Sequence, residues 1–223
     1  MCVCVSVVCP IVATWSSSLK KNPSILGYTW FSDEGWLHLS GYVNSQNSRV
    51  LASENSNVIH EEPLHSEKIV VWYGMSRRRI FGPIFSDATT ITTAPCTDIF
   101  STFVNQLDDE ELSTGYFQQD GATSHTSHVS MAQIQSFFGD PVISKGLWPL
   151  RSPDLTPPDY FLWGYLKGRV YRNKPRTTDA LRANITEEIQ AVKGDVLART
   201  FQNMECRVQS CLDANGGDFQ HVL

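Results

Sequence analysis

Two apolar stretches, Lys68-Ile69-Val70-Val71-Trp72-Tyr73 and Ile80-Phe81-Gly82-Pro83-Ile84-Phe85, give the clearest structural signal in the chain. Both are rich in β-branched and aromatic side chains, which favour strands. The polar tip Ser76-Arg77-Arg78-Arg79 lies between them. The pattern predicts an antiparallel β-hairpin. We interpret its three arginines as a solvated turn, with contact to a phosphate group as the alternative.

The sequence on either side of this hairpin predicts an alternation of strands and helices. A first strand is expected over Tyr28–Ser32, ending at Asp33, and a helix is expected to begin at Asp98. Apolar periodicity predicts further strands at 116–119 and 142–143, and helices near 131–138, 160–171, 181–192 and 197–211. This order predicts an α/β fold in which a mixed sheet carries helices on both faces.

Composition and length favour one folded domain. The chain has 223 residues, of which 41% are hydrophobic and 11% aromatic, and this excludes a disordered chain. No apolar run reaches the roughly 18 residues that a membrane-spanning helix needs, so we expect no membrane partner. We expect residues 1–26 to form a poorly structured segment and residues 27–223 to form the domain, with a long polar insertion over residues 36–67.

The charge is unevenly distributed along the chain. The formal net charge is −5, yet residues 141–182 hold eight basic and three acidic side chains. A basic segment on an acidic body can still bind a phosphate backbone. The overall charge therefore does not exclude a nucleic-acid partner.

Three aspartates occupy positions where chemistry is expected. Asp33 and Asp120 follow predicted strands, and Asp159 opens a predicted helix. Ligand sites in α/β sheets gather beyond strand ends, so these carboxylates could converge. Converging carboxylates repel one another unless a cation lies among them, and hard oxygen ligands select Mg²⁺ or Mn²⁺. Taken singly, each aspartate could instead be an ordinary turn or cap residue.

Several segments resemble one known family. They are Phe31-Ser32-Asp33-Glu34-Gly35-Trp36, Gln118-Gln119-Asp120-Gly121-Ala122-Thr123-Ser124-His125-Thr126 and Trp148-Pro149-Leu150-Arg151-Ser152-Pro153-Asp154-Leu155-Thr156-Pro157-Pro158-Asp159. Together they resemble the acidic triad of mariner-type transposases, in the Tc/mariner superfamily of DDE transposases, whose catalytic domain is ribonuclease-H-like. Further matches are Gly41 to Asn47, Val71-Trp72 with Gly82-Pro83, and Cys211 to Phe219, so the likeness runs from Trp30 to the end.

The resemblance implies metal-dependent phosphodiester chemistry on DNA. Asp33, Asp120 and Asp159 would hold two Mg²⁺ or Mn²⁺ ions. One ion would activate water to cut at the end of the element, and the freed 3′-hydroxyl would then attack target DNA. The resemblance also implies DNA as partner, a homodimer as in dimeric family members, and the nucleus as location.

Two further residues compete for roles at this site. Asp154 is the alternative to Asp159, although the family position four residues after Leu155 favours Asp159. His125 lies five residues after Asp120 and is expected either to support a ligand or contact substrate, or to be an ordinary helix-start histidine. Glu34 is not expected to be a ligand, because strand alternation directs it away from the side of Asp33.

The basic residues downstream of Asp159 could follow a DNA backbone, with a solvated helix end as the alternative. They are Lys167, Arg169, Arg172, Lys174 and Arg176. The family carries N-terminal helix-turn-helix modules, but the 32 residues before Asp33 show no such pattern. We therefore expect no sequence-specific binding of element ends, and whether the copy is truncated or inactive stays open. The alternatives to a transposase catalytic domain are a non-catalytic nucleic-acid-binding or interaction remnant and, from the apolar N-terminus, a secreted domain.

Overall fold

The structure is a computed structural model that describes residues 12–13, 16–17, 25–41, 67–86, 93–122, 125–139, 142–143, 153–217 and 219. Its centre is a five-stranded sheet in the order β3-β2-β1-β4-β5. The strands are β1 (Thr29–His38), β2 (Lys68–Met75), β3 (Ile80–Ser86), β4 (Tyr116–Gln118) and β5 (Val142–Ile143). The first three are antiparallel to one another, whereas β4 runs parallel to β1 and to β5. The predicted mixed sheet and hairpin are therefore confirmed.

The first strand is longer than the sequence predicted. It was expected to end at Asp33, and this was wrong, because β1 continues to His38 in register with β2, from Phe31 opposite Met75 to His38 opposite Lys68. The apolar β2 strand supplies a ladder of eight paired positions, which overrides the weak strand propensity of the segment after Asp33. The strand thus extends three residues into the predicted insertion. Residues 42–66 of that insertion lie outside the described residues.

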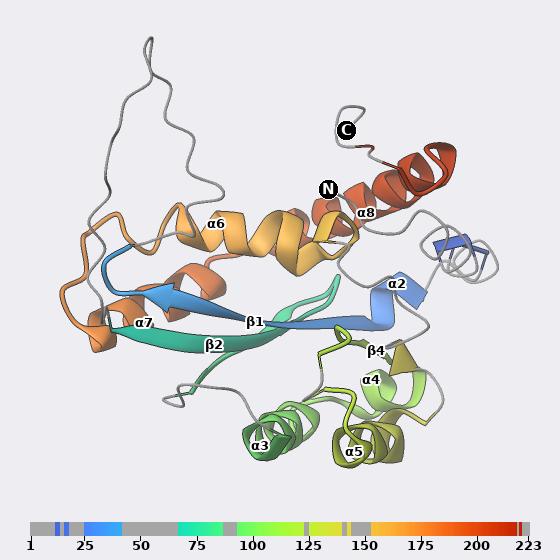
Figure 1. The fold of residues 1–223 in the computed structure, drawn as a ribbon, viewed down its shortest axis with the longest axis horizontal. Helices are drawn as coiled ribbons and strands as arrows, with labels where there is room; N and C mark the ends of the chain where they lie inside the picture. The colour runs from blue at the N-terminus through green and yellow to red at the C-terminus, as the bar shows by residue number, and fades with distance from the viewer. Residues whose placement is uncertain are drawn as a thin grey trace, which may run out of the picture.

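Helices cover both faces of the sheet, as predicted (Figure 1). One face carries α3 (Thr93–Val104), α4 (Asp109–Thr114) and α5 (His128–Phe138). The other carries η2 (Pro153–Leu155), η3 (Pro158–Leu162), α6 (Trp163–Lys167), α7 (Thr178–Gln190) and α8 (Gly194–Asp213), and α2 (Ile25–Tyr28) leads into β1. In the described part of the chain no helix is long and apolar enough to cross a bilayer.

One helix begins earlier than the sequence indicated. Asp98 was expected to cap it, but α3 already begins at Thr93, so Asp98 lies inside the helix. Pro95 falls in the first turn, where its missing N–H has no helical partner to lose. The proline is therefore compatible with a start that apolar periodicity did not reveal.

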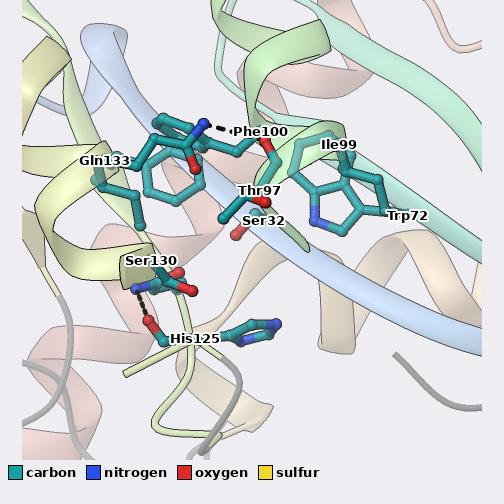
Figure 2. Close-up of a pocket in the computed structure, with 11 residues that line it drawn as sticks. Ser32, Trp72, Thr97, Ile99, Phe100, His125, Ser130 and Gln133 are labelled. Carbon is teal, nitrogen blue, oxygen red and sulfur yellow. Dashed lines mark hydrogen bonds between the residues drawn. The ribbon is translucent and has the colours of Figure 1, made fainter. Parts of the chain in front are cut away.

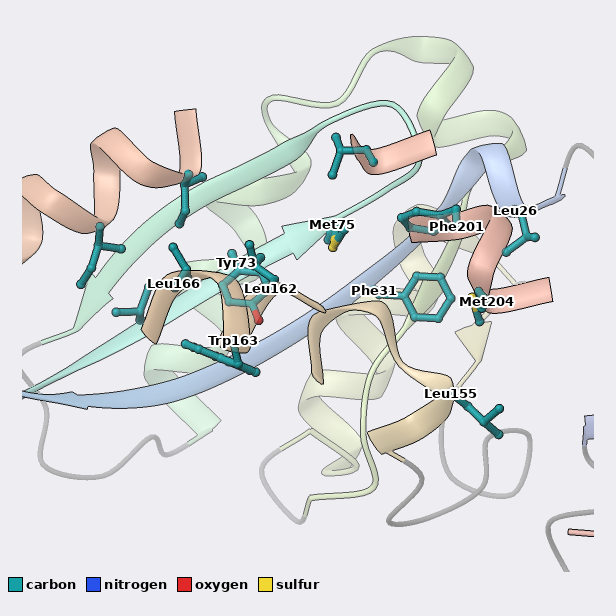
Figure 3. Packing of buried hydrophobic residues seen from close by; sticks show 14 of the residues in the cluster. Leu26, Phe31, Tyr73, Met75, Leu155, Leu162, Trp163, Leu166, Phe201 and Met204 are labelled. Atoms are coloured by element: carbon teal, nitrogen blue, oxygen red, sulfur yellow. The ribbon is translucent and has the colours of Figure 1, made fainter. Parts of the chain in front are cut away.

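Each face of the sheet has its own hydrophobic core. The larger cluster packs Phe31, Tyr73 and Met75 against the helices after residue 153, including Phe201 of α8 (Figure 3). The smaller cluster packs Trp30 and Trp72 against α3 and α5. Consecutive residues of β1 therefore face opposite layers, as strand geometry requires. Asp33 therefore lies on the same face of the sheet as Phe31, and Glu34 lies on the same face as Trp30.

The N-terminal segment contributes to the larger core where it is described. Val12 is 3% exposed and Leu26 is 1% exposed, and both belong to that cluster. Most of residues 1–26 lies outside the described residues. The predicted division between residues 1–26 and 27–223 stays a prediction.

Candidate active site

Asp33 is fixed by the helices on the larger-core face. It lies on β1 opposite Tyr73. The pairing of β1 with β4 ends at Phe31, two residues before Asp33. Its Oδ2 accepts a hydrogen bond of 2.7 Å from the indole Nε1 of Trp163, and its Oδ1 accepts one of 2.9 Å from the backbone N–H of Glu34. Both oxygens of this carboxylate are thus oriented by donors.

A glycine makes this contact possible. A Cβ on Gly35 would lie 2.3 Å from the Trp163 ring, far inside van der Waals contact, so only glycine lets the indole lie against β1. On its other side the indole packs against the Tyr73 ring, with centroids 5.0 Å apart. Strand β1 and helix α6 therefore meet at a site shaped by Gly35, and the indole N–H meets the Asp33 carboxylate there.

Asp159 lies in the first turn of η3, and its backbone N–H donates to the carbonyl of Thr156 at 2.9 Å. Leu162 and Trp163, three and four residues further along the chain, are buried. Asp159 itself is exposed. A helical turn with two buried anchors therefore holds a carboxylate at the surface.

The acids act on one another electrostatically. Burial, and after it the charge of Asp159, raises the pKa of Asp33 to about 8. Partial desolvation raises the pKa of Asp159, and the charges of Asp120 and Asp154 add to the rise, against a hydrogen bond from Thr156 and the charge of Lys167. The three predicted carboxylates therefore influence one another in a chain from Asp33 through Asp159 to Asp120.

Asp120 is held in a different way from Asp33. It follows β4, as predicted, and its Oδ1 accepts from the backbone N–H of Ala122 at 2.9 Å and lies 2.5 Å from Nδ1 of His125. Desolvation alone would raise its pKa, but the hydrogen bonds from His125 and Ala122 outweigh it and bring the pKa below the ordinary value. The other ring nitrogen of His125, Nε2, lies 3.1 Å from Oε1 of Glu34.

The donor set fits a hard divalent cation. It consists of carboxylate oxygens, the ligands that Mg²⁺ and Mn²⁺ prefer. In the described residues, Oε2 of Glu34 is a buried carboxylate oxygen with no hydrogen-bond partner, and the hydroxyl of Tyr73 is also buried without one. Across the same residues, however, no three His, Cys, Asp or Glu side chains gather closely enough to hold an ion. Repelling carboxylates are expected to stay apart without a cation.

A small cavity lies beside His125, between the sheet and helices α3 and α5 (Figure 2). Its polar lining includes Ser32, Gln119 and Ser130, and its volume is about 20 Å³. That volume suits about one water molecule. The cavity is too small for a nucleotide.

The predicted basic contacts fall into two groups. At the hairpin tip, Arg78 pairs with Glu110 at 3.3 Å and Arg79 pairs with Glu111 at 2.6 Å, so two of the three arginines bind α4. These ion pairs favour the structural interpretation of the tip, and Arg77 is exposed.

The second group follows α6. Arg169 pairs with Glu188 at 3.6 Å, and Lys167 lies over the Trp163 ring at 6.0 Å. The remaining predicted contacts are exposed: Arg172, Lys174 and Arg176. A role for this group in DNA binding stays a prediction.

Asp154 lies in η2, and its backbone carbonyl accepts a hydrogen bond of 3.1 Å from Arg207 of α8. This contact fixes the turn that precedes Asp159. The choice of Asp159 as the third acid stays a prediction.

Sequence reasoning missed two contacts of the site. The hydrogen bond from Trp163 to Asp33 joins residues 130 positions apart, and Gly35 next to the acid was its only local signal. The contact of His125 with Glu34 was also missed. Strand alternation had correctly directed Glu34 away from Asp33.

Two curated proteins of Caenorhabditis elegans are similar in sequence. The transposable element Tc1 transposase is 27% identical over 149 residues, covering 66% of this chain and 52% of that protein. The transposable element Tc3 transposase is 33% identical over 107 residues, covering 47% of this chain and 31% of that protein. The chain thus spans about half the length of the first relative and about a third of the second. No protein-family profile matches it.

Solved structures of Mos1 mariner transposase share the fold. The Mos1 catalytic domain superposes with a TM-score of 0.74 at 15% identity, covering 97% of this chain and 95% of that one. A Mos1 paired-end complex with the left transposon end superposes with a TM-score of 0.79 at 16% identity, covering 97% of this chain and 63% of that one. The expected ribonuclease-H-like fold is therefore confirmed. The chain is thus similar in sequence to the Tc1 and Tc3 transposases and shares the fold of the Mos1 transposase catalytic domain.

Proposed function

We propose that this chain cleaves phosphodiester bonds in DNA and transfers the resulting strand end, using Mg²⁺ or Mn²⁺. The observation that carries the proposal is the Asp33 carboxylate, which Trp163 and the Glu34 amide orient and on which the charge of Asp159 acts, on the fold of the Mos1 transposase catalytic domain. The charge of Asp159 raises the pKa of Asp33, and a divalent cation would relieve that repulsion. Structures of the Mos1 catalytic domain with Mg and with Mn support the choice of ion.

Asp33, Asp120 and Asp159 are the proposed ligands of two ions. When bound, such ions supply activated water and stabilise charge on the attacking and leaving oxygens of a phosphodiester. The chain itself orients the ligands. Trp163 and the Glu34 amide fix Asp33, the η3 turn presents Asp159 to solvent, and His125 with the Ala122 amide holds one oxygen of Asp120.

DNA is the proposed substrate, and a second copy of the chain is the proposed partner. Structural neighbours include Mos1 paired-end and strand-transfer complexes, which support both proposals. The exposed residues after α6 provide positive charge for phosphate groups: Arg172, Lys174 and Arg176, with Lys167 and Arg169 beside them. Activity on DNA implies the nucleus as the site of action.

The test is nicking of supercoiled plasmid by the purified chain. We expect nicking without sequence choice when Mn²⁺ or Mg²⁺ is added, and none with EDTA. Asp120→Asn should reduce nicking to the EDTA background, whereas Asp154→Asn should retain it. Equal nicking by the wild type and Asp120→Asn would show that the activity comes from another site or a contaminant.

A second candidate is a DNA-binding domain that does not cleave. It is favoured by the absence, within the described residues, of three metal-binding side chains already gathered. In that case DNA binding would persist in a gel-shift assay, while a calorimetric titration with Mn²⁺ would show no heat that depends on Asp120. The proposed cleavage requires such heat.

A further inference from the structure

His125 joins two carboxylates that come from different parts of the sheet. Its Nδ1 lies 2.5 Å from Oδ1 of Asp120, which follows β4, and its Nε2 lies 3.1 Å from Oε1 of Glu34 on β1. The residue is 5% exposed, while the Asp120 side chain is 61% exposed. The buried imidazole of His125 therefore links the exposed Asp120 to strand β1.

The backbone around His125 holds the ring in place. The N–H of His125 donates to the carbonyl of Ala122 at 3.1 Å, and its carbonyl accepts from the side-chain amide of Gln119 at 3.1 Å. Figure 2 shows the residue at the edge of the small cavity, where the imidazole projects from the chain. Hydrogen bonds to the N–H and to the carbonyl of His125 therefore hold its backbone, and with it the base of the side chain, in place.

We propose that His125 is a positioning residue for Asp120, with Glu34 as the carboxylate that orients the imidazole. The proposal rests on the proposed function, because it takes Asp120 as a ligand of the divalent ion. His125 and Ala122 occupy Oδ1 of Asp120, and Oδ2 has no hydrogen bond in the described residues. The bridge therefore stops an exposed side chain from rotating and leaves one oxygen for the ion.

Strand β1 then serves both acids. Asp33 and Glu34 are neighbours in sequence but point to opposite faces of the sheet. Asp33 is held directly by Trp163, while Glu34 reaches Asp120 through His125. A change at Glu34 should therefore act on Asp120, although Asp33 is adjacent to it.

The test is the affinity of the purified chain for Mn²⁺, measured by calorimetry. Residues that orient a metal ligand from behind typically contribute 10–100-fold to metal affinity. His125→Ala should therefore bind Mn²⁺ about 10–100-fold more weakly than the wild type. The matched control is His128→Ala, because His128 is exposed at the start of α5, and its affinity should equal that of the wild type.

A double-mutant cycle separates positioning from general destabilisation. Glu34→Ala should weaken Mn²⁺ binding, and His125→Ala/Glu34→Ala should bind no more weakly than His125→Ala alone, because both changes break one bridge. Glu34→Gln keeps an oxygen for Nε2 and should restore much of the affinity that Glu34→Ala loses. Simple additivity of the two alanine changes, or no recovery with Gln, would overturn the bridge.

The outcomes distinguish the two proposals. If the wild type shows no Mn²⁺ binding that Asp120→Asn removes, the proposed function fails. If the wild type binds and His125→Ala binds equally well, the positioning role fails and the proposed function stands. If His125→Ala does not unfold cooperatively on heating, Glu34→Ala and Glu34→Gln decide the matter, and equal affinity of both variants to the wild type overturns the proposal.

Discussion

Asp33 and Asp120 carry the same side chain, but their surroundings restrict it in different ways and shift its pKa in opposite directions. Asp33 lies within the sheet, under a tryptophan, and burial raises its pKa to about 8. Asp120 lies in an exposed loop, and although desolvation opposes the change, hydrogen bonds from His125 and Ala122 lower its pKa. One acid is fixed by packing and the other by polar contacts.

The difference shows that a strand and a loop restrict a carboxylate side chain by different means. A rigid strand fixes the position of its side chain but removes water, so the charge of Asp33 is destabilised. A loop keeps water but needs a polar bridge to restrict its side chain. The first arrangement should be sensitive to changes in shape, and the second to changes in charge.

The largest effect should come from filling the space at Gly35. The Cβ of Gly35→Ala would overlap the Trp163 ring at 2.3 Å and push the indole from Asp33. Overpacking and the lost hydrogen bond together should destabilise the chain by about 3 kcal/mol, measured by urea unfolding. The control is Gly164→Ala in α6, where a Cβ meets nothing within 4 Å, so stability should change by less than about 0.5 kcal/mol. Equal stability of both variants would contradict the described packing.

A smaller effect should follow from removing only the donor. Trp163→Phe keeps an aromatic ring but removes the N–H that binds Asp33. It should cost about 1 kcal/mol in urea unfolding at pH 7, the usual net contribution of a hydrogen bond to a neutral group. Trp36→Phe is the control because Trp36 is partly exposed at 36%. The same cost of Trp163→Phe in an Asp33→Ala background as in the wild type would mean that the indole only fills space.

The comparison of Asp33 with Asp120 predicts that, in the absence of divalent ions, their contributions to stability depend on pH with opposite sign. The folded pKa of Asp33 lies above the ordinary 3.8, so its contribution to stability is full below pH 3.8 and is lost as pH rises towards 8. The folded pKa of Asp120 lies below 3.8, so its contribution is present above that value and is lost as pH falls through the folded pKa.

Thermal unfolding in EDTA at several pH values tests these signs. Relative to the wild type, Asp33→Asn should gain stability between pH 5 and pH 8, while Asp120→Asn should be less stable at pH 7 than at pH 3. Parallel curves for the two variants would remove the proposed contrast between the surroundings of the acids.

The smallest effect is expected at Tyr73. Its hydroxyl is buried beside the acids with no hydrogen-bond partner among the described residues, so Tyr73→Phe should change the free energy of unfolding by less than about 0.5 kcal/mol. Tyr171→Phe is the contrasting control, because that hydroxyl donates to the carbonyl of His38 at 2.8 Å and its loss should cost about 1 kcal/mol. A larger cost at Tyr73 than at Tyr171 would indicate that the Tyr73 hydroxyl has a partner.

Local patterns predicted most elements of the fold and the places of Asp120, after β4, and Asp159, at the start of a helical segment. The hairpin over residues 68–85 and the acid after β4 follow from strand composition and strand ends. The extension of β1 beyond Asp33 did not, because it depends on the β2 partner and not on residues 34–38 themselves. The end of a strand is therefore the least secure part of a fold prediction that rests on residue propensity alone.

Contacts between distant segments were equally invisible in the sequence. Trp163 and Asp33 are 130 positions apart, and Arg79 and Glu111 are 32 apart, so no local period connects either pair. The arginines of the hairpin tip illustrate the consequence. The sequence favoured a solvated turn, with a phosphate contact as the alternative, while the fold supplied Glu110 and Glu111 as partners for Arg78 and Arg79.

Anomalous scattering from Mn²⁺ in crystals of the wild-type chain tests the central claim most directly. If Asp33, Asp120 and Asp159 serve one catalytic centre, the strongest peak will lie about 2.1 Å from carboxylate oxygens of at least two of them. Soaked crystals of Asp33→Asn should lose or weaken that peak. Mn²⁺ bound only at other positions, with all three carboxylates empty at saturating concentration, would contradict the account.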